Sequence, residues 1–179
     1  MNKKDILRII KYAVYAIFGT GKLKRKTVEN FAMNLRNKKI LEIGSGKKEN
    51  GEHNYSTIKF FHKSNTFIQS DINPEYGHKV IDITKMKYKN EFDVIICLSV
   101  LEHVYDFNSA IKNLYNSLKK DGTLLLYLPF LYPLHDEPQD YWRFTEHSIR
   151  KLLVNFSKIE IKHSGIRSYP LTYFIKATK

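Results

Sequence analysis

Cysteine and long apolar runs are the features that this sequence most clearly lacks. Cys97 is the single cysteine among 179 residues, which excludes an internal disulfide bond and a zinc site built from cysteines. The longest uncharged stretch covers residues 122–134 and contains two prolines. A membrane-spanning helix needs about 20 consecutive apolar residues. We therefore expect no membrane span, and the sequence indicates no metal site.

Acidic residues are also scarce, and the resulting charge is unevenly placed. The chain has 30 lysines and arginines against 18 acids, a net charge of +12. Residues 1–40 alone hold 11 basic and 2 acidic residues, so the rest of the chain carries only +3. With 42% apolar and 27% charged residues, the composition is typical of a globular domain. The excess charge thus belongs mainly to one short segment.

Residues 1–38 form this basic segment, and we expect two amphipathic helices in it. The Gly-Thr-Gly sequence at 19–21 should end the first helix, and Thr27 suits the N-cap of the second. Arg8 and Lys11 interrupt the apolar part of the first helix, so a secretory signal fits poorly. We therefore expect a cytoplasmic protein.

The basic segment has three interpretations. Its helices could cover the open side of a substrate pocket, with the lysines in water. Residues 1–26 could instead lie on an anionic membrane surface, where each basic residue adds about 1 kcal/mol of attraction. The third partner is nucleic acid, which is disfavoured because nothing resembling an RNA-binding module accompanies the segment.

From residue 39 onward, short apolar runs alternate with helical patterns. A helix should begin after Asp106, with two others near 55–62 and 146–154. The strands are expected at 40–43, 66–70, 79–82, 92–98, 123–128, 156–163 and 171–177. This alternation predicts an α/β domain over 39–179, a doubly wound Rossmann-like sheet of seven strands. The last two runs should pair as a hairpin, which makes the last strand antiparallel.

A glycine-containing turn follows the first expected strand, in the sequence Glu42-Ile-Gly44-Ser-Gly46. Glycines allow the sharp backbone turn that a close ligand requires. A dinucleotide site would want a third glycine where this chain has Glu49. An acid at Glu42, and another at Glu49, would repel a pyrophosphate but suit a ligand that carries positive charge, such as a sulfonium.

Two further acids lie at strand ends. Asp71 ends the second expected strand, where a carboxylate can accept hydrogen bonds from both ribose hydroxyls. Asp82 ends the third, where it can accept from an adenine amino group. Each alone could be a surface acid or a helix cap, but together they indicate a bound adenosine.

The run Phe92-Asp-Val-Ile-Ile-Cys-Leu-Ser-Val-Leu-Glu-His-Val-Tyr-Asp106 completes a resemblance. With the two turns above, it resembles the class I S-adenosylmethionine-dependent methyltransferases, most closely the type 11 group, over about residues 40–177. The resemblance implies S-adenosylmethionine as the cofactor. It also implies the following cofactor contacts: Glu42, Gly44 and Gly46 at the methionine end, Asp71 at the ribose, Ile72, Asp82 and Ile83 around the adenine, and Leu98 and Ser99 beside the methionine. The family often has a third glycine where this chain has Lys48.

The acceptor-side residues are expected in the loop 129–145, which resembles a subgroup linked to polysaccharide or other secondary biosynthesis. His135 is the base of this loop that titrates near neutral pH, and His103 should face it from the fourth strand. These two histidines are the candidate catalytic residues. Asp140, Tyr141 and Arg143 are the candidate acceptor-binding residues, although Asp140 and Arg143 could equally form a structural ion pair.

The predicted function is methyl transfer from S-adenosylmethionine to a small-molecule or glycan-type acceptor, at oxygen. A nucleic-acid methyltransferase, for example one acting on RNA, is the first alternative. Many enzymes that methylate base nitrogens carry an Asn/Asp-Pro-Pro-aromatic motif where this chain has residues 98–101, Leu-Ser-Val-Leu. The second alternative is a non-catalytic protein that binds the cofactor only, which the altered loop at Lys48 favours.

Overall fold

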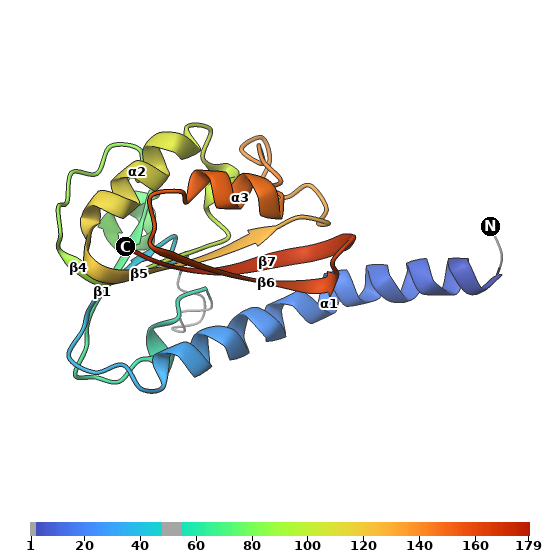
Figure 1. The fold of residues 1–179 in the computed structure, drawn as a ribbon, viewed down its shortest axis with the longest axis horizontal. Helices are drawn as coiled ribbons and strands as arrows, with labels where there is room; N and C mark the ends of the chain where they lie inside the picture. The colour runs from blue at the N-terminus through green and yellow to red at the C-terminus, as the bar shows by residue number, and fades with distance from the viewer. Residues whose placement is uncertain (1–2, 48–54) are drawn as a thin grey trace.

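The computed structural model describes residues 3–47 and 55–179, so Lys48 and Glu49 lie outside the described part (Figure 1). A long helix, α1 (Lys3–Ala32), precedes the sheet. The helices α2 (Phe107–Ser117) and α3 (Glu146–Leu152) and three short 3-10 turns, η1 (Ile58–Phe60), η2 (Pro74–Tyr76) and η3 (Leu101–His103), lie between strands. The strands are β1 (Lys39–Ile43), β2 (Thr66–Asp71), β3 (Lys79–Val80), β4 (Phe92–Leu98), β5 (Leu118–Pro129), β6 (Lys158–Ile166) and β7 (Tyr169–Thr178).

The strands form one seven-stranded sheet in the order β3-β2-β1-β4-β5-β7-β6. The first five strands are parallel, while β7 runs antiparallel to both β5 and β6. The predicted doubly wound sheet with a terminal hairpin is therefore confirmed. The chain order reverses between β1 and β4, and ligands bind at such a reversal, beyond the carboxyl ends of the strands.

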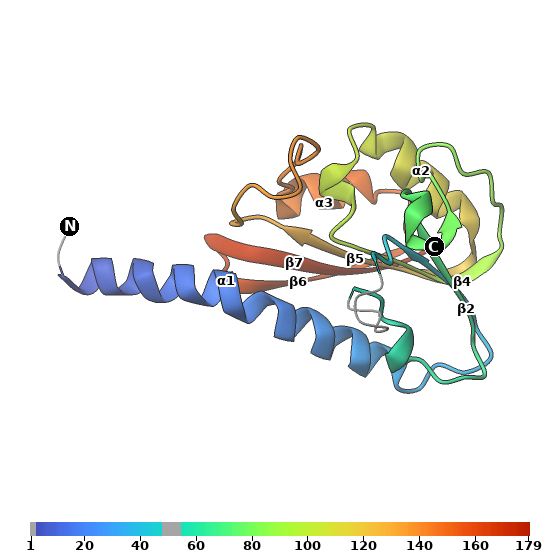
Figure 2. The same cartoon turned by 180° about the vertical axis from the view of Figure 1, so that it is seen from behind.

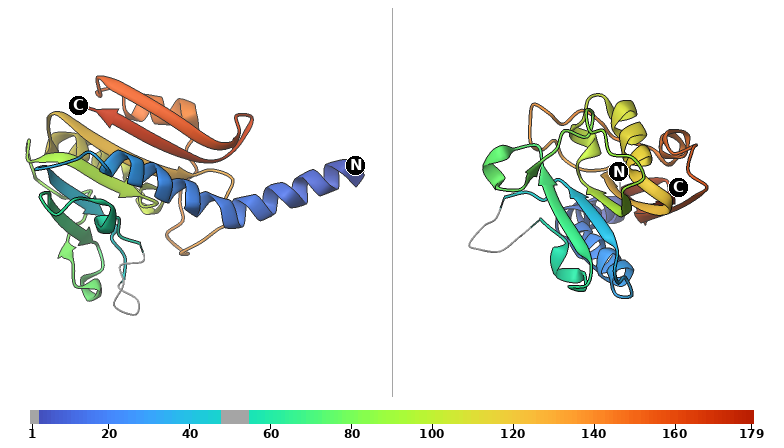
Figure 3. Two further views of the ribbon diagram at one scale, coloured as in Figure 1. Left: turned by 90° about the horizontal axis from the view of Figure 1, so that it is seen from below. Right: turned by 90° about the vertical axis from the view of Figure 1, so that its left-hand side faces the viewer.

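Helices cover both faces of this sheet. Figures 1 and 3 show α2 and α3 on one face and α1 across the other. The alternation of side chains along β4 matches this arrangement, since Ile95 packs in the core beneath α2 and α3 while Val94 packs with Val28 of α1. Both faces of β4 are buried, as a central parallel strand requires.

The prediction of two N-terminal helices is wrong, because α1 is continuous from Lys3 to Ala32. Gly19 and Gly21 each cost about 1 kcal/mol in a helix interior, which lowers stability without forcing a break. The lysines and arginine at 22–26 favour the helix and carry it into Thr27, which lies inside it. The first half of α1 extends past the β6–β7 hairpin (Figures 1 and 2).

Other element boundaries also differ from the sequence prediction, and three of the differences are instructive. The helix expected at 55–62 is only the 3-10 turn η1, and the third strand ends at Val80. The fifth strand begins at Leu118 rather than Thr123, because the backbone adopts an extended conformation at Leu118, directly after α2. Asp106 caps α2 as predicted, accepting a hydrogen bond from the Ser109 N–H at 3.1 Å.

Candidate active site

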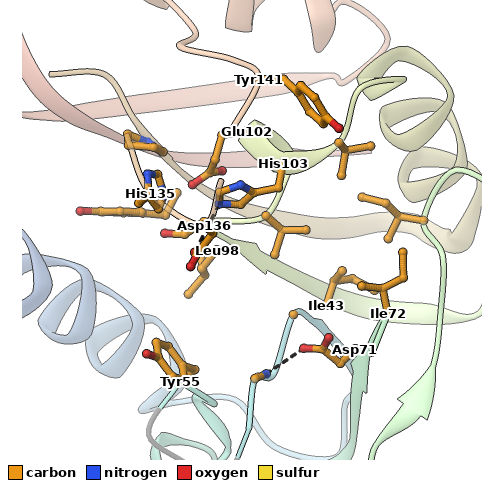
Figure 4. Close-up of a pocket in the computed structure, with 18 of the residues that line it drawn as sticks. Ile43, Tyr55, Asp71, Ile72, Leu98, Glu102, His103, His135, Asp136 and Tyr141 are labelled. Atoms are coloured by element: carbon orange, nitrogen blue, oxygen red, sulfur yellow. Dashed lines mark hydrogen bonds and ion pairs between the residues drawn. The ribbon is translucent and has the colours of Figure 1, made fainter. Parts of the chain in front are cut away.

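A cavity of about 1090 Å³ opens at the carboxyl ends of the parallel strands. The predicted residues that line it are Gly44, Gly46, Asp71, Ile72, Asp82, Ile83, Leu98, Ser99, His103, His135 and Tyr141. Figure 4 shows Asp71 and Ile72 on one side of the cavity, with Glu102, His103 and His135 on the other. Glu42, Asp140 and Arg143 were also predicted to contact a ligand, but they are not among the lining residues.

The turn after β1 requires glycine at two positions. Gly44 and Gly46 have φ angles of 73° and 68°, in the left-handed region that side chains disfavour. A Cβ on Gly44 would overlap Cγ2 of Val100, and one on Gly46 would lie 2.8 Å from the ring of Tyr55. The two glycines thus let the backbone pass close to neighbouring side chains at the wall of the cavity.

Glu42 lies behind this turn and does not face the cavity. Its buried carboxylate accepts hydrogen bonds from the hydroxyls of Ser45 and Ser56, and from the N–H and hydroxyl of Thr57. Four donors fill the lone pairs of both oxygens, so direct contact with a cofactor, as the resemblance implied, does not fit. Glu42 instead ties the glycine turn to residues 56–57.

The acids at the end of β2 and beyond β3 both line the cavity. One oxygen of Asp71 accepts from the Gly46 N–H at 2.9 Å and the other from the Asn73 N–H at 3.1 Å. Each oxygen keeps a second lone pair. The hydroxyl of Thr84 donates to Asp82 at 2.6 Å and lowers the pKa of that carboxyl. The apolar side chains of Ile72 and Ile83 line the cavity near these acids.

Lys24, which was not predicted as a site residue, reaches the cavity from α1. Its Nζ donates to the hydroxyl of Ser99 at 3.2 Å and lies 5.1 Å from the ring centre of Tyr127. Burial lowers the pKa of Lys24, while the charges of Glu102 and Glu42 raise it. The sequence feature that could have identified Lys24 is its helical spacing, because it lies four residues before Val28 and therefore on the same face of α1.

Glu102, in η3, is the least expected member of the site. Its side chain is fully buried and lines the cavity, and neither carboxylate oxygen has a hydrogen-bond partner among the described residues. Its backbone carbonyl accepts from the N–H groups of Tyr141 and Trp142 at 3.0 and 3.2 Å. Burial raises the pKa of Glu102 to about 7. No role was predicted for Glu102 from the sequence.

The two predicted catalytic histidines meet beside Glu102. The rings of His103 and His135 are 4.8 Å apart, edge to face. Nδ1 of His103 lies 3.0 Å from the carbonyl oxygen of Gln139, and Nδ1 of His135 lies 3.2 Å from that of Pro133. Both Nδ1 atoms therefore serve as donors, which leaves each Nε2 as an acceptor.

Asp140 and Arg143 form a bidentate ion pair that holds the loop rather than lining the cavity. The two guanidinium nitrogens donate to the two carboxylate oxygens at 2.6 and 2.7 Å. Arg143 also donates to the Pro133 carbonyl, and Asp140 accepts from the His135 N–H at 3.0 Å. The guanidinium holds the pKa of Asp140 well below its usual range. Of the three predicted acceptor-binding residues, Tyr141 alone lines the cavity.

Comparison with known sequences identifies the domain. A family model described as a methyltransferase domain matches residues 15–161. The tRNA U34 carboxymethyltransferase of Helicobacter pylori (strain Shi470) is 40% identical over 67 residues, which cover 37% of this chain and 23% of that protein. Its counterpart in Sulfurimonas denitrificans is 36% identical over 63 residues, 35% of this chain and 20% of that protein. The match thus spans less than a quarter of these relatives' length.

Solved structures share the fold at low sequence identity. Magnesium protoporphyrin IX methyltransferase from Synechocystis PCC 6803, solved with bound SAH, has a TM-score of 0.66 and 18% identity, covering 89% of this chain and 83% of that chain. Phosphoethanolamine N-methyltransferase 2 of Haemonchus contortus has a TM-score of 0.67 and 13% identity, covering 87% and 52%. Because the family model matches most of the chain, this protein belongs to the methyltransferase domain family.

Proposed function

We propose that this enzyme transfers the methyl group of S-adenosylmethionine to a hydroxyl of a small-molecule or glycan-type acceptor. The observation that carries the proposal is a single cavity with two chemically different ends. One end has two acids and two isoleucines, which suit a nucleoside. The other has Glu102, His103 and His135, which suit the removal of a proton.

The described residues at the first end fit the cofactor. Asp71 has free lone pairs for the two ribose hydroxyls, and Ile72 and Ile83 offer apolar surface to an adenine. The methionine part would lie between the glycine turn and Ser99. Lys24 would then face the cofactor carboxylate, where a cation is favourable. When bound, the cofactor supplies an electrophilic methyl group on a cationic sulfur.

The second end supports transfer to oxygen. A hydroxyl acceptor must lose its proton as its oxygen attacks the methyl carbon, while the sulfur keeps the electron pair of the breaking C–S bond. Nε2 of His135 is available to take that proton, because Nδ1 is engaged with the Pro133 carbonyl. Tyr132 and Tyr141 line the same region and offer aromatic faces that suit a sugar ring.

We further propose that α1 brings the enzyme to an anionic membrane. No helix in the described part of the chain is long and apolar enough to cross one. However, Ile6, Leu7, Ile9 and Ile10 are exposed on the part of α1 that extends past the sheet (Figure 2). Residues 1–26 also hold eight basic residues and one acid. This combination is typical of a helix that lies in a membrane surface.

Transfer to RNA is the second candidate function, and one specific observation favours it. The curated relatives that match over a short segment are named as tRNA-modifying enzymes. The net charge of +12 would also attract phosphates. A glycan-type acceptor remains our first choice, because +9 of that net charge belongs to residues 1–40 and only +3 to the rest of the chain, which forms most of the cavity.

Transfer of a labelled methyl group tests these functions. The protein would be incubated with labelled cofactor and, separately, with polar metabolites, lipid-linked glycans or total tRNA. We expect label in the metabolite or glycan fractions, a reduction of at least 100-fold in His135→Gln, and no change in His163→Gln, an exposed histidine outside the cavity. Label confined to tRNA would establish the second candidate instead.

Vesicle binding tests the role of α1. The protein should sediment with vesicles that contain phosphatidylglycerol and not with pure phosphatidylcholine vesicles. Leu7→Asn combined with Ile10→Asn should abolish this binding, while Val154→Asn, an exposed apolar position elsewhere, should not. Equal sedimentation of all three proteins would contradict the proposal.

A further inference from the structure

We infer that Glu102, His103 and His135 form a binding site for a divalent transition-metal ion in the acceptor half of the cavity. One carboxylate oxygen and one nitrogen from each imidazole lie within 4.8 Å of one another. Two histidines and one carboxylate are a common ligand set for Zn²⁺ and Fe²⁺ when further positions stay open to substrate or water. No metal was expected from the sequence, because the chain lacks a set of cysteine ligands and no role was predicted for Glu102.

The carboxylate of Glu102 points to a missing partner. It is completely buried, and both oxygens lack a hydrogen-bond partner in the described structure. Leaving a buried carboxylate unpaired is costly, so its retention inside the cavity needs an explanation. A bound cation between Glu102 and the two imidazoles would provide the missing charge and the missing ligand bonds.

The surroundings of the histidines match those of metal ligands. A ligating histidine usually donates its other N–H to a carbonyl or a carboxylate, which fixes the ring and its tautomer. His103 does so toward Gln139, and His135 does so toward the Pro133 carbonyl. Nδ1 of His135 also lies 3.2 Å from the Asp140 carboxylate. Because each Nδ1 already has a partner, we assign Nε2 as the ligand atom of both histidines.

The separation of the ligand atoms requires a modest closure. Ligands held about 2.1 Å from one tetrahedral ion lie about 3.4 Å apart, against the present spacing of up to 4.8 Å. Side-chain rotations that move each ligand atom by about 1 Å would bring the atoms to this spacing. Asp136, whose carboxylate lies 3.9 Å from Nε2 of His103 and is largely exposed, also lines the cavity beside the cluster (Figure 4).

The consequence for the reaction rests on the proposed function, whereas metal binding itself does not. An ion at this position lowers the pKa of a coordinated hydroxyl, so the acceptor proton can pass to water. The acceptor oxygen then attacks the methyl carbon, and the sulfur leaves with the C–S electron pair. With the ion bound, Nε2 of His135 would hold the ion instead of taking the proton itself, and the ion, as a Lewis acid, would let water accept the proton of the coordinated hydroxyl.

Cobalt titration tests the inference without any methyl acceptor. Protein without a histidine tag, treated with a chelator and desalted, would be titrated with Co²⁺ and followed by its visible d–d absorption. We expect one equivalent to bind with the spectrum of a site of low coordination number. Glu102→Gln and His135→Gln should weaken binding at least 10-fold, and His163→Gln should bind as the wild type does.

The outcomes separate the two proposals. Absence of a Co²⁺ spectrum in wild-type protein that still binds S-adenosylhomocysteine would overturn the metal site and leave the proposed function intact. Equal Co²⁺ binding by wild type and both site variants would overturn it too, and thermal melts would verify that the variants fold. Site-dependent Co²⁺ binding without methyl transfer to a hydroxyl would support the metal site and contradict the proposed function.

Discussion

Replacing Asp140 by asparagine should destabilise the protein substantially, because it leaves a charge without its partner. The Asp140 side chain is 1% exposed and the Arg143 side chain 23%, and the two share a bidentate contact. Removing one member of a buried ion pair costs about 3–5 kcal/mol. We expect the lower end, about 3 kcal/mol, since Arg143 keeps its bonds to backbone carbonyls and some contact with water.

For a chain of this size, 1 kcal/mol shifts the melting temperature by about 2–4 °C. Asp140→Asn should therefore melt about 6–12 °C below the wild type in calorimetry at pH 7. Glu160→Gln is the matched control, because Glu160 pairs with Lys158 and Lys176 on the surface. Exposed pairs contribute at most about 1 kcal/mol, so this variant should melt within a few degrees of the wild type.

The pH dependence gives a second, independent check. The folded pKa of Asp140 lies below its unfolded value of about 3.9. The stability that this carboxylate contributes is therefore complete above about pH 4 and is lost as the pH falls through the folded pKa. The difference between wild type and Asp140→Asn should shrink below pH 4. A difference under 2 °C at pH 7, or one that does not change with acid, would refute the reasoning.

Two further predictions concern the cofactor half of the cavity. Gly44→Ala should weaken S-adenosylhomocysteine binding at least 10-fold in calorimetric titration, because the new Cβ overlaps Val100. Gly77→Ala is the control and should bind normally, because Gly77 has a similar φ of 71° but open space around it. Equal affinity of the two variants would contradict this prediction. Lys24→Met should weaken S-adenosylhomocysteine binding about 10-fold. The melting temperature should stay the same or rise, because the desolvated amine is replaced by an apolar group. Unchanged affinity would show that Lys24 does not contact the cofactor.

Much of the fold was predictable because its signals are local. Short apolar runs that alternate with helical periodicity define strands and helices, and the brief turn near Gly165 forces the last two strands into a hairpin. The break predicted in α1 failed for a thermodynamic reason. Two glycines lower helix stability by about 2 kcal/mol in total, and residues 28–32 pack on the sheet and anchor the helix.

The candidate site was predictable in part. Asp71, Asp82 and the two glycines lie at the carboxyl ends of strands, so topology alone brings them to the cavity. Glu42 occupies a similar sequence position but turns away, because Ser56 and Thr57, 14 and 15 residues further along the chain, donate hydrogen bonds to it together with the nearby Ser45. Nothing in the local sequence distinguishes these two outcomes. They depend on tertiary contacts that only the folded chain provides.

Glu102 illustrates the same limit at the acceptor end. It follows Leu101 in a single 3-10 turn, in which either Glu102 or His103 could have faced solvent. The loop at 139–142 decides the matter, because its N–H groups bond the Glu102 carbonyl and its carbonyl orients His103. The Asp140–Arg143 pair in turn holds that loop. The Asp140–Arg143 pair, which was predicted to bind the acceptor, therefore positions Glu102 and His103 through this loop.

Because α1 is continuous, it fixes the position of the basic N-terminal segment relative to the cavity. With two separate helices, the basic segment could have moved independently of the cavity. A single helix rises about 1.5 Å per residue, so Leu7 lies about 26 Å from Lys24 along one axis. Lys24 is part-buried at the cavity and Val28 is buried in the core, so the exposed apolar turns are held at a defined position relative to the site. A membrane that binds those turns would therefore also fix the distance of the cavity from the lipid surface, which a lipid-linked acceptor would have to span.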